Sequence, residues 1–73
     1  MKIVKLERTC FACPEQWEGV TEDGSTVYAR ERHGEMRVEL NGEVILRREN
    51  MTALDGLYRC FEIPVEVLEN SYE

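Results

Sequence analysis

Two cysteines separated by two residues form the one pair in the sequence with a recognised metal-ligand spacing. Thiolates at Cys10 and Cys13 can chelate a single zinc ion, and a tetrahedral site then needs two further ligands. Cys60 and His33 are the remaining Cys and His residues, so the candidate metal set is Cys10, Cys13, Cys60 and His33. A single Cys-x-x-Cys pair does not specify zinc, and core thiols or a redox pair stay open as interpretations. We expect no cofactor, with one structural zinc as the alternative.

Arginine and aromatic side chains in the middle of the chain form a candidate partner-binding surface: Trp17, Tyr28, Arg30, Arg32 and Arg37. They reverse the sign of charge locally in a chain whose net charge is −6. Arginine, Trp and Tyr are enriched in binding hot spots, and a guanidinium can stack on an indole while it binds a carboxylate or phosphate. Ordinary cross-strand packing accounts for the same residue types, so both interpretations stay open.

No catalytic constellation is recognisable in the sequence. His33 is the sole histidine, and no Ser–His–Asp or Cys–His arrangement can be argued around it. Nothing pairs the many glutamates across a predicted cleft, and a domain this small leaves little room for a substrate pocket. We predict that the chain is not an enzyme.

Three turn signals position these side chains: Asp23-Gly24, His33-Gly34 and Asn41-Gly42, each between β-patterned runs. Such spacing is typical of an antiparallel meander, and two-residue turns need the left-handed backbone that Gly and Asn tolerate. A two-residue turn at Asp23-Gly24 places Trp17 opposite Arg30, Gly19 opposite Tyr28 and Val20 opposite Val27. A second at His33-Gly34 places Val27 opposite Leu40, Ala29 opposite Val38 and Glu31 opposite Met36.

Both turns give one apolar face, because directly opposed residues share a face of the sheet. This predicted core face comprises Val20, Val27, Ala29, Met36, Val38 and Leu40. The other face comprises Trp17, Gly19, Tyr28, Arg30, Arg32, Glu35, Arg37 and Glu39. At Asn41-Gly42 we expect a bulge next to Gly42, which brings Val44 and Leu46 inward.

The ends of the chain complete the predicted fold. Residues 2–7 are expected to add a strand, residues 50–56 a loop with at most one helical turn, and residues 57–63 a last strand. Pro64 then starts a short helix with Val65, Leu68 and Tyr72 on one face. The alternative is an edge strand through Ile63, Val65 and Val67. The fold class is mainly β (small α+β): a single domain over residues 1–73 with an antiparallel β-meander of about five strands and a short C-terminal helix.

Charge and cysteine content limit the classes of partner. The 73 residues include 15 acidic and 9 basic side chains, which disfavours nucleic acid and an anionic membrane and favours a basic protein partner. Acidity that merely keeps a small domain in solution is the alternative. With no signal-peptide pattern or membrane-length apolar run, we expect a cytoplasmic protein with reduced cysteines. An open edge strand makes a homodimer compatible with this layout.

The segment Cys13-Pro14-Glu15-Gln16-Trp17-Glu18-Gly19, followed by Asp23-Gly24 and by Tyr28-Ala29-Arg30-Glu31-Arg32, resembles a pattern in small, uncharacterised bacterial and phage-encoded proteins. The resemblance covers about residues 10–38 and implies the same hairpins and a prokaryotic or viral origin, but no activity and no site residues. The leading functional hypothesis is a small acidic protein-binding module, of the kind with which a phage or mobile element inhibits or regulates a host protein. The alternatives are a zinc-stapled structural or interaction module, and a single-stranded nucleic-acid binder that uses the arginine–aromatic face.

Overall fold

The structure is a computed structural model that describes residues 1–10 and 15–70. Five strands form one antiparallel sheet in the order β1-β2-β3-β4-β5. The strands are β1 (Ile3–Cys10), β2 (Glu15–Thr21), β3 (Thr26–Arg32), β4 (Glu35–Leu40) and β5 (Glu43–Glu49), and the helices are α1 (Ala53–Cys60) and α2 (Val65–Asn70). The predicted fold class, a mainly β meander with a short C-terminal helix, is confirmed.

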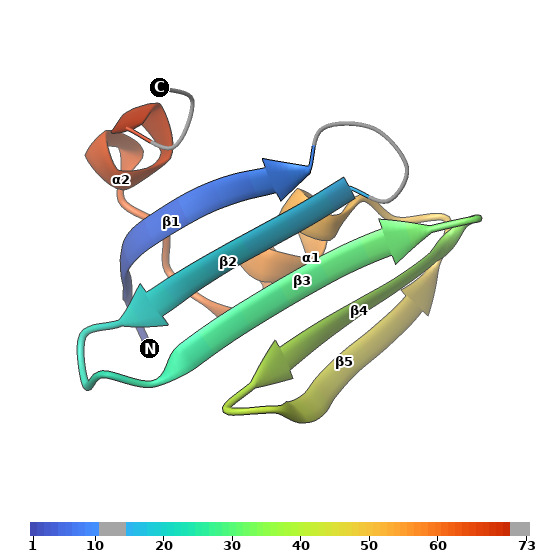
Figure 1. The fold of residues 1–73 in the computed structure, drawn as a ribbon, viewed down its shortest axis with the longest axis horizontal. Helices are drawn as coiled ribbons and strands as arrows, with labels where there is room; N and C mark the ends of the chain where they lie inside the picture. Colours follow the sequence, from blue (N-terminus) through green and yellow to red (C-terminus); the bar gives the residue numbers. More distant parts are fainter. Residues whose placement is uncertain (11–14, 71–73) are drawn as a thin grey trace.

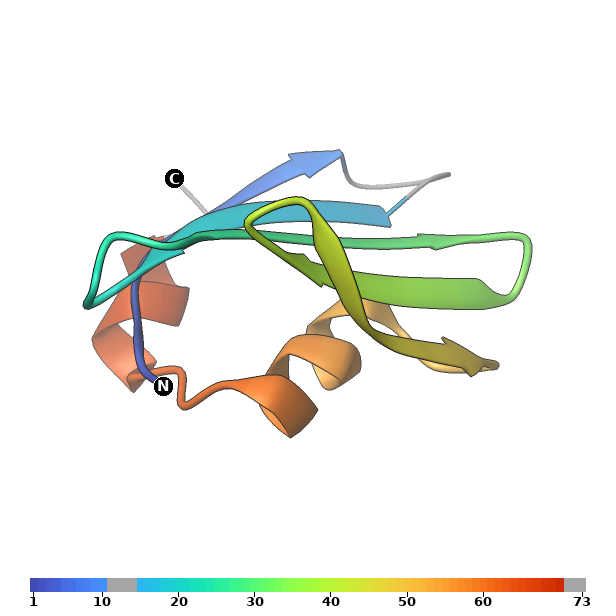
Figure 2. The ribbon, with the colours of Figure 1, turned by 90° about the horizontal axis from the view of Figure 1, so that it is seen from below.

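The molecule has two layers, because both helices lie on the same side of the sheet (Figures 1 and 2). Helix α1 packs across β2, β3, β4 and β5, and α2 packs on β1. The core between the layers comprises Ile3, Leu6, Trp17, Val27, Ala29, Met36, Val38, Ala53, Leu57, Phe61 and Ile63. The opposite face of the sheet, called the outer face below, has no helix over it in the described part of the chain.

The hairpin between β3 and β4 has the predicted register. His33 and Gly34 have φ angles of 54° and 83°, as a two-residue primed turn requires. Val27 pairs with Leu40, Ala29 with Val38, and Glu31 with Met36. Val27, Ala29, Met36 and Val38 are therefore in the core, as the sequence indicated.

The hairpin between β2 and β3 differs from the prediction by one residue. The N–H of Thr21 donates to the Ser25 carbonyl at 2.9 Å, so the loop has three residues, 22–24, instead of two. Trp17 consequently pairs with Ala29, and Val20 pairs with Thr26. Because a one-residue slip moves every side chain to the other face, Trp17 and Thr21 are buried and Val20 lies on the outer face. The predicted placements of Trp17, Gly19 and Val20 were wrong.

The hairpin between β4 and β5 combines a two-residue turn with a bulge. Asn41 and Gly42 have φ angles of 52° and 85°, and Leu40 pairs with Glu43. The register then shifts: Glu39 pairs with Val44 but Val38 with Leu46, so Ile45 is the extra residue of β5. A bulge was predicted, but it lies further along the strand than the position next to Gly42, and it brings only Leu46 against the core.

Residues 53–60 form a helix, so the predicted loop over 50–56 and strand over 57–63 were wrong. Thr52 caps α1 by accepting a hydrogen bond from the backbone N–H of Asp55 at 3.1 Å. Ala53, Gly56 and Leu57 are buried at helical spacing. A Cβ built on Gly56 would lie 2.5 Å from Met36 Sδ, so this glycine lets α1 approach β4 closely.

The predicted C-terminal helix is present as α2. The Pro64 carbonyl accepts from the N–H groups of Val67 and Leu68 at 3.1 and 3.2 Å. Val67 and Leu68 pack against the core, whereas Val65 is 69% exposed, so the apolar face is not the predicted one. Tyr72, the third predicted member of that face, lies outside the described residues.

Candidate binding face

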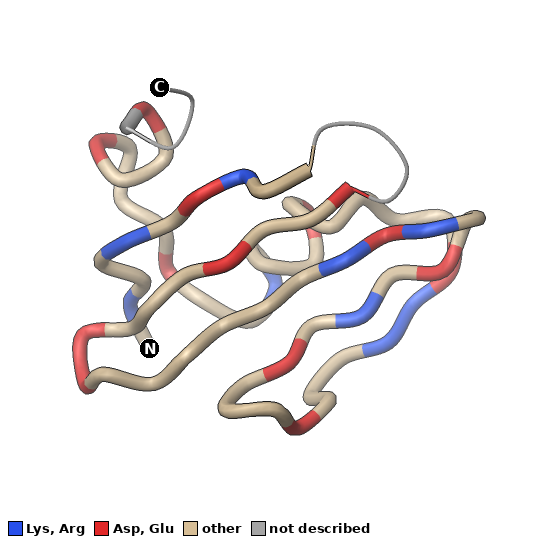
Figure 3. Tube along the Cα trace, viewed as in Figure 1, with Lys and Arg blue, Asp and Glu red and all other residues tan. Residues whose placement is uncertain are grey.

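Three arginines lie side by side on the outer face in direct cross-strand register. Arg30 of β3 pairs with Arg37 of β4, which pairs with Arg47 of β5. Gln16 of β2 continues this line, since it pairs with Arg30. We call Arg30, Arg37 and Arg47 the arginine row; Figure 3 shows the blue segments of β3, β4 and β5 next to one another.

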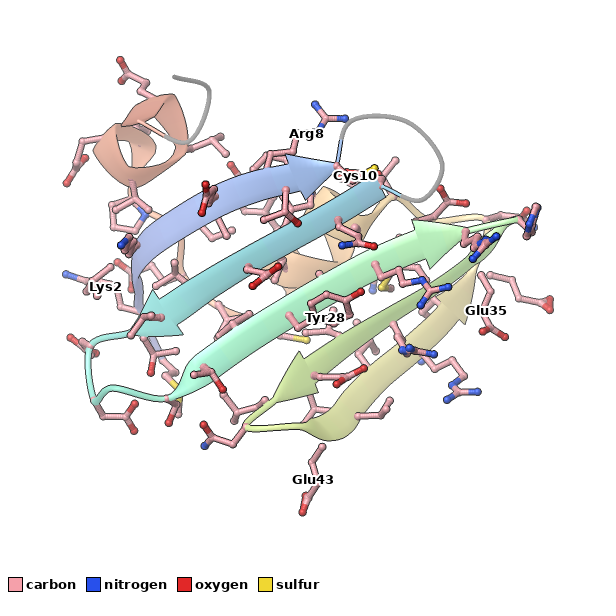
Figure 4. All side chains as sticks on the ribbon, viewed as in Figure 1. Lys2, Arg8, Cys10, Tyr28, Glu35 and Glu43 are labelled. Carbon is pink, nitrogen blue, oxygen red and sulfur yellow. The ribbon has the colours of Figure 1, made fainter. Side chains whose placement is uncertain are left out.

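Carboxylates border the arginine row on both sides along the strands. On one side, an acidic row crosses the sheet, in which Glu7 pairs with Glu18, Glu18 with Tyr28, and Tyr28 with Glu39. On the other side, at the end of the hairpin, a tip row pairs Arg32 with Glu35 and Glu35 with Glu49. Tyr28 and Glu35, both labelled in Figure 4, mark these two borders. Strand β4 therefore presents Glu35, Arg37 and Glu39 in succession on the outer face.

Within the residues that the structure describes, one ion pair neutralises charges of these rows. Arg37 Nε lies 3.0 Å from Glu39 Oε2, which is a salt bridge between the arginine row and the acidic row. The guanidinium groups of Arg30, Arg32 and Arg47 form no hydrogen bond or ion pair within residues 1–10 and 15–70. Since like charges directly opposed in a sheet repel, the row holds positive charge available to an anion.

An open cavity of about 370 Å³ lies at the arginine row and the hairpin end. It is lined by Arg30, Arg32, His33, Glu35 and Arg37. Three guanidinium groups and one carboxylate thus face the same space, and its volume is within the range of small-ligand sites. This arrangement can bind an oxyanion through charge-assisted hydrogen bonds.

Four of the five predicted partner-binding residues lie on this face, and Trp17 does not. Tyr28, Arg30, Arg32 and Arg37 share the outer face, as the register of β3 with β4 shows. Trp17 is 1% exposed and belongs to the core. Its ring contacts the guanidinium of Arg8, whose Cζ is 5.4 Å from the ring centroid. The slip in the first hairpin is the physical reason, and Trp17 is not a surface residue.

Sequence reasoning missed Arg47 and the acidic row. Arg47 reaches the outer face and pairs with Arg37 because it follows Leu46, which packs against the core. Glu18 replaces Gly19 as the neighbour of Tyr28 because of the one-residue slip. Arg47 had a signal in the sequence, because the expected inward position of Leu46 places the next residue of the strand on the outer face. For the first turn, a Thr-x-Asp segment can indicate a loop that side chains close.

The candidate metal ligands lie on different elements. Cys10 ends β1, Cys60 ends α1, and His33 occupies the turn between β3 and β4. Cys13 lies outside the described residues. Within the described ranges, no three His, Cys, Asp or Glu side chains are grouped as a metal site, and Cys10 and Cys60 are free thiols. Burial raises the pKa of the Cys60 thiol, partly offset by the charge of Arg48.

No protein-family model, curated protein or solved structure matches this chain. Neither helix in the described part of the chain has the length and apolar character needed to cross a bilayer. The geometry of the outer face is therefore the basis for a functional proposal.

Proposed function

We propose that this chain is a small protein-binding module that contacts its partner through the outer face. The observation that supports this most directly is the arginine row, in which Arg30, Arg37 and Arg47 are directly opposed on the face away from both helices. Exposed, like-charged neighbours weaken a sheet. A partner that places negative charge between the arginines removes this repulsion, so the arginine row favours the complex over the free protein.

The charge of the whole molecule suits a partner that is basic around the contact. The net charge is −6, which attracts a basic protein at long range. The arginine row then contacts a local acidic group on that partner, while the acidic row and tip row contact its basic side chains. We propose that such a complex inhibits or regulates the partner, as a phage or mobile-element protein does with a host protein.

Site-specific photo-crosslinking in an extract of the cells that make the protein tests this proposal. A photoreactive amino acid at Gln16 reports on the arginine row, and one at Glu66 reports on the exposed surface of α2. We expect discrete crosslinked proteins from position 16 and none of the same species from position 66. Trp17→Ala is unsuitable as a probe of binding, because it empties the core.

The matched variants are Arg30→Gln with Arg47→Gln, and Lys2→Gln with Arg59→Gln as a control that removes the same number of positive charges away from the outer face. The arginine-row variant is expected to abolish the crosslinks from position 16, and the control variant to retain them. Equal crosslinking in both variants contradicts the proposal. Crosslinks made only to nucleic acid contradict it too, and support the single-stranded nucleic-acid alternative.

A further inference from the structure

We propose further that the group bound by the arginine row is a phosphate monoester on a partner side chain, flanked two residues away on each side by basic side chains. This proposal rests on the protein-binding function proposed above and specifies which chemical group of the partner is bound. The phosphate binds among Arg30, Arg32 and Arg37, in the cavity that His33 and Glu35 also line.

The number of guanidinium groups favours phosphate over carboxylate. A carboxylate has two oxygens and one negative charge, so one bidentate arginine satisfies it. A phosphate monoester carries a charge of about −1.5 to −2 at neutral pH and three strong acceptor oxygens, enough for two or three arginines. Three arginines line the cavity. The salt bridge to Glu39 uses Nε of Arg37, which leaves its two terminal nitrogens for a ligand.

The carboxylate borders favour an isolated phosphate over a nucleic-acid strand. A strand presents successive phosphates, and a site that follows it needs a continuous positive groove. Along β4 the positive charge is one row deep, because Glu35 and Glu39 lie on either side of Arg37, whereas on β3 Arg32 extends it by one position towards the turn. The successive phosphates of a strand that lies along β4 would meet these carboxylates and be repelled. Tyr28 is the single aromatic residue of the three rows, and it lies between Glu18 and Glu39.

Strand geometry gives the register of the ligand. Residues two apart along β4 are separated by about 6.6–6.8 Å, which is also the separation of alternate residues in an extended peptide. A peptide that lies along β4 with its phosphorylated residue over Arg37 therefore places residues two before and two after over the two glutamates. The complementary ligand is a basic-x-phosphoresidue-x-basic segment.

Fluorescence anisotropy with labelled peptides tests this inference. The probe is Ala-Arg-Ala-phosphoserine-Ala-Arg-Ala, and the comparison peptides carry unmodified serine, or glutamate in place of both arginines. We expect the probe to bind about tenfold or more tightly than either comparison peptide, roughly the effect of one charge-assisted hydrogen bond. Arg30→Lys keeps the charge but loses the fork geometry, and should weaken binding by about tenfold; Glu66→Gln on α2 should not change it.

Three results overturn the inference. These are equal binding of phosphorylated and unmodified peptides, an unchanged affinity in Arg30→Lys, or tighter binding of a single-stranded oligonucleotide of equal length than of the probe. Phosphatase treatment of the cell extract before crosslinking separates this inference from the proposed function. Crosslinks that survive phosphatase but vanish in the variant with Arg30→Gln and Arg47→Gln show that the bound group is not a phosphate. They leave the protein-binding function supported. Absence of crosslinks from position 16 in untreated extract refutes the function itself.

Discussion

Trp17 Nε1 donates a hydrogen bond of 2.8 Å to Glu15 Oε2, and the other oxygen of the same carboxylate accepts one of 3.3 Å from the backbone N–H of Ala53. One side chain thus joins the largest buried residue of β2 to the first turn of α1. A carboxylate at a helix N-terminus is also favoured by the partial positive charge there. Glu15 therefore links the start of α1 to β2.

Replacing Glu15 by alanine should lower the free energy of unfolding by about 1–3 kcal/mol, because it leaves the buried Trp17 Nε1 without this acceptor. Urea denaturation followed by Trp fluorescence measures the loss. Glu18→Ala, an exposed glutamate of the same strand, is the control and should change stability far less. Equal losses in the two variants would show that Glu15 has no special role.

Gly19→Ala should destabilise the sheet by about 1–3 kcal/mol, although alanine is usually the better strand residue. A Cβ at position 19 would lie 2.6 Å from the backbone carbonyl oxygen of Lys5, so β1 and β2 would have to move apart. Thermal or urea denaturation checks this change. Val20→Ala on the neighbouring outer-face position is the comparison, and a Gly19→Ala protein as stable as wild type contradicts the close approach.

Arg30→Gln should increase stability by about 0.2–1 kcal/mol at low salt, because it removes one member of a like-charged pair with Arg37. At about 1 M salt, where the Debye length is about 3 Å, the gain should largely disappear. Lys5→Gln makes the same change in net charge but lies opposite Val20, so it should give no gain. A gain that is unaffected by salt would argue against charge repulsion as its cause.

The pH dependence of stability should include a contribution from Asp23. Its carboxylate accepts hydrogen bonds from the Thr21 hydroxyl and from the Ser25 N–H, which lower its pKa from the ordinary value of 3.8. Because the folded state favours the charged form, this stabilisation is present above pH 3.8 and is lost as the pH falls through the lowered pKa. Denaturation midpoints measured between about pH 5 and pH 2 should fall more steeply for wild type than for Asp23→Asn. Parallel profiles would contradict the assignment.

The sequence alone predicted the register of the hairpin between β3 and β4, because the backbone preferences of its two turn residues determine that turn. His33 and Gly34 both adopt positive φ, and the resulting register places every residue of β3 and β4 as expected. At the first hairpin, side chains decide instead: the Thr21 hydroxyl bonds to Asp23 and accepts from the Ser25 N–H, which closes a three-residue loop. A turn dipeptide does not encode that choice, so Trp17 was assigned to the wrong face.

Helix α1 and Arg47 were missed for different reasons. Residues 50–56 were predicted to be a loop, but the close packing against Met36 requires a glycine at position 56 of the helix, and Thr52 with Asp55 supplies the cap. Arg47 was omitted from the predicted face although the expected inward position of Leu46 already places the next residue on the outer face, because side chains alternate along a strand.

The bulge in β5 also bears on how the protein behaves when it is concentrated. A straight, apolar outermost strand is a template on which further chains can add. In β5 the extra residue Ile45 interrupts the regular spacing, and an Arg48 guanidinium nitrogen lies 2.9 Å from the carbonyl oxygen of Arg47 and occupies it. Three charged residues, Arg47, Arg48 and Glu49, end the strand. We therefore expect the strand to resist the growth of fibrils from its edge, even though its own residues Val44 and Ile45 are exposed.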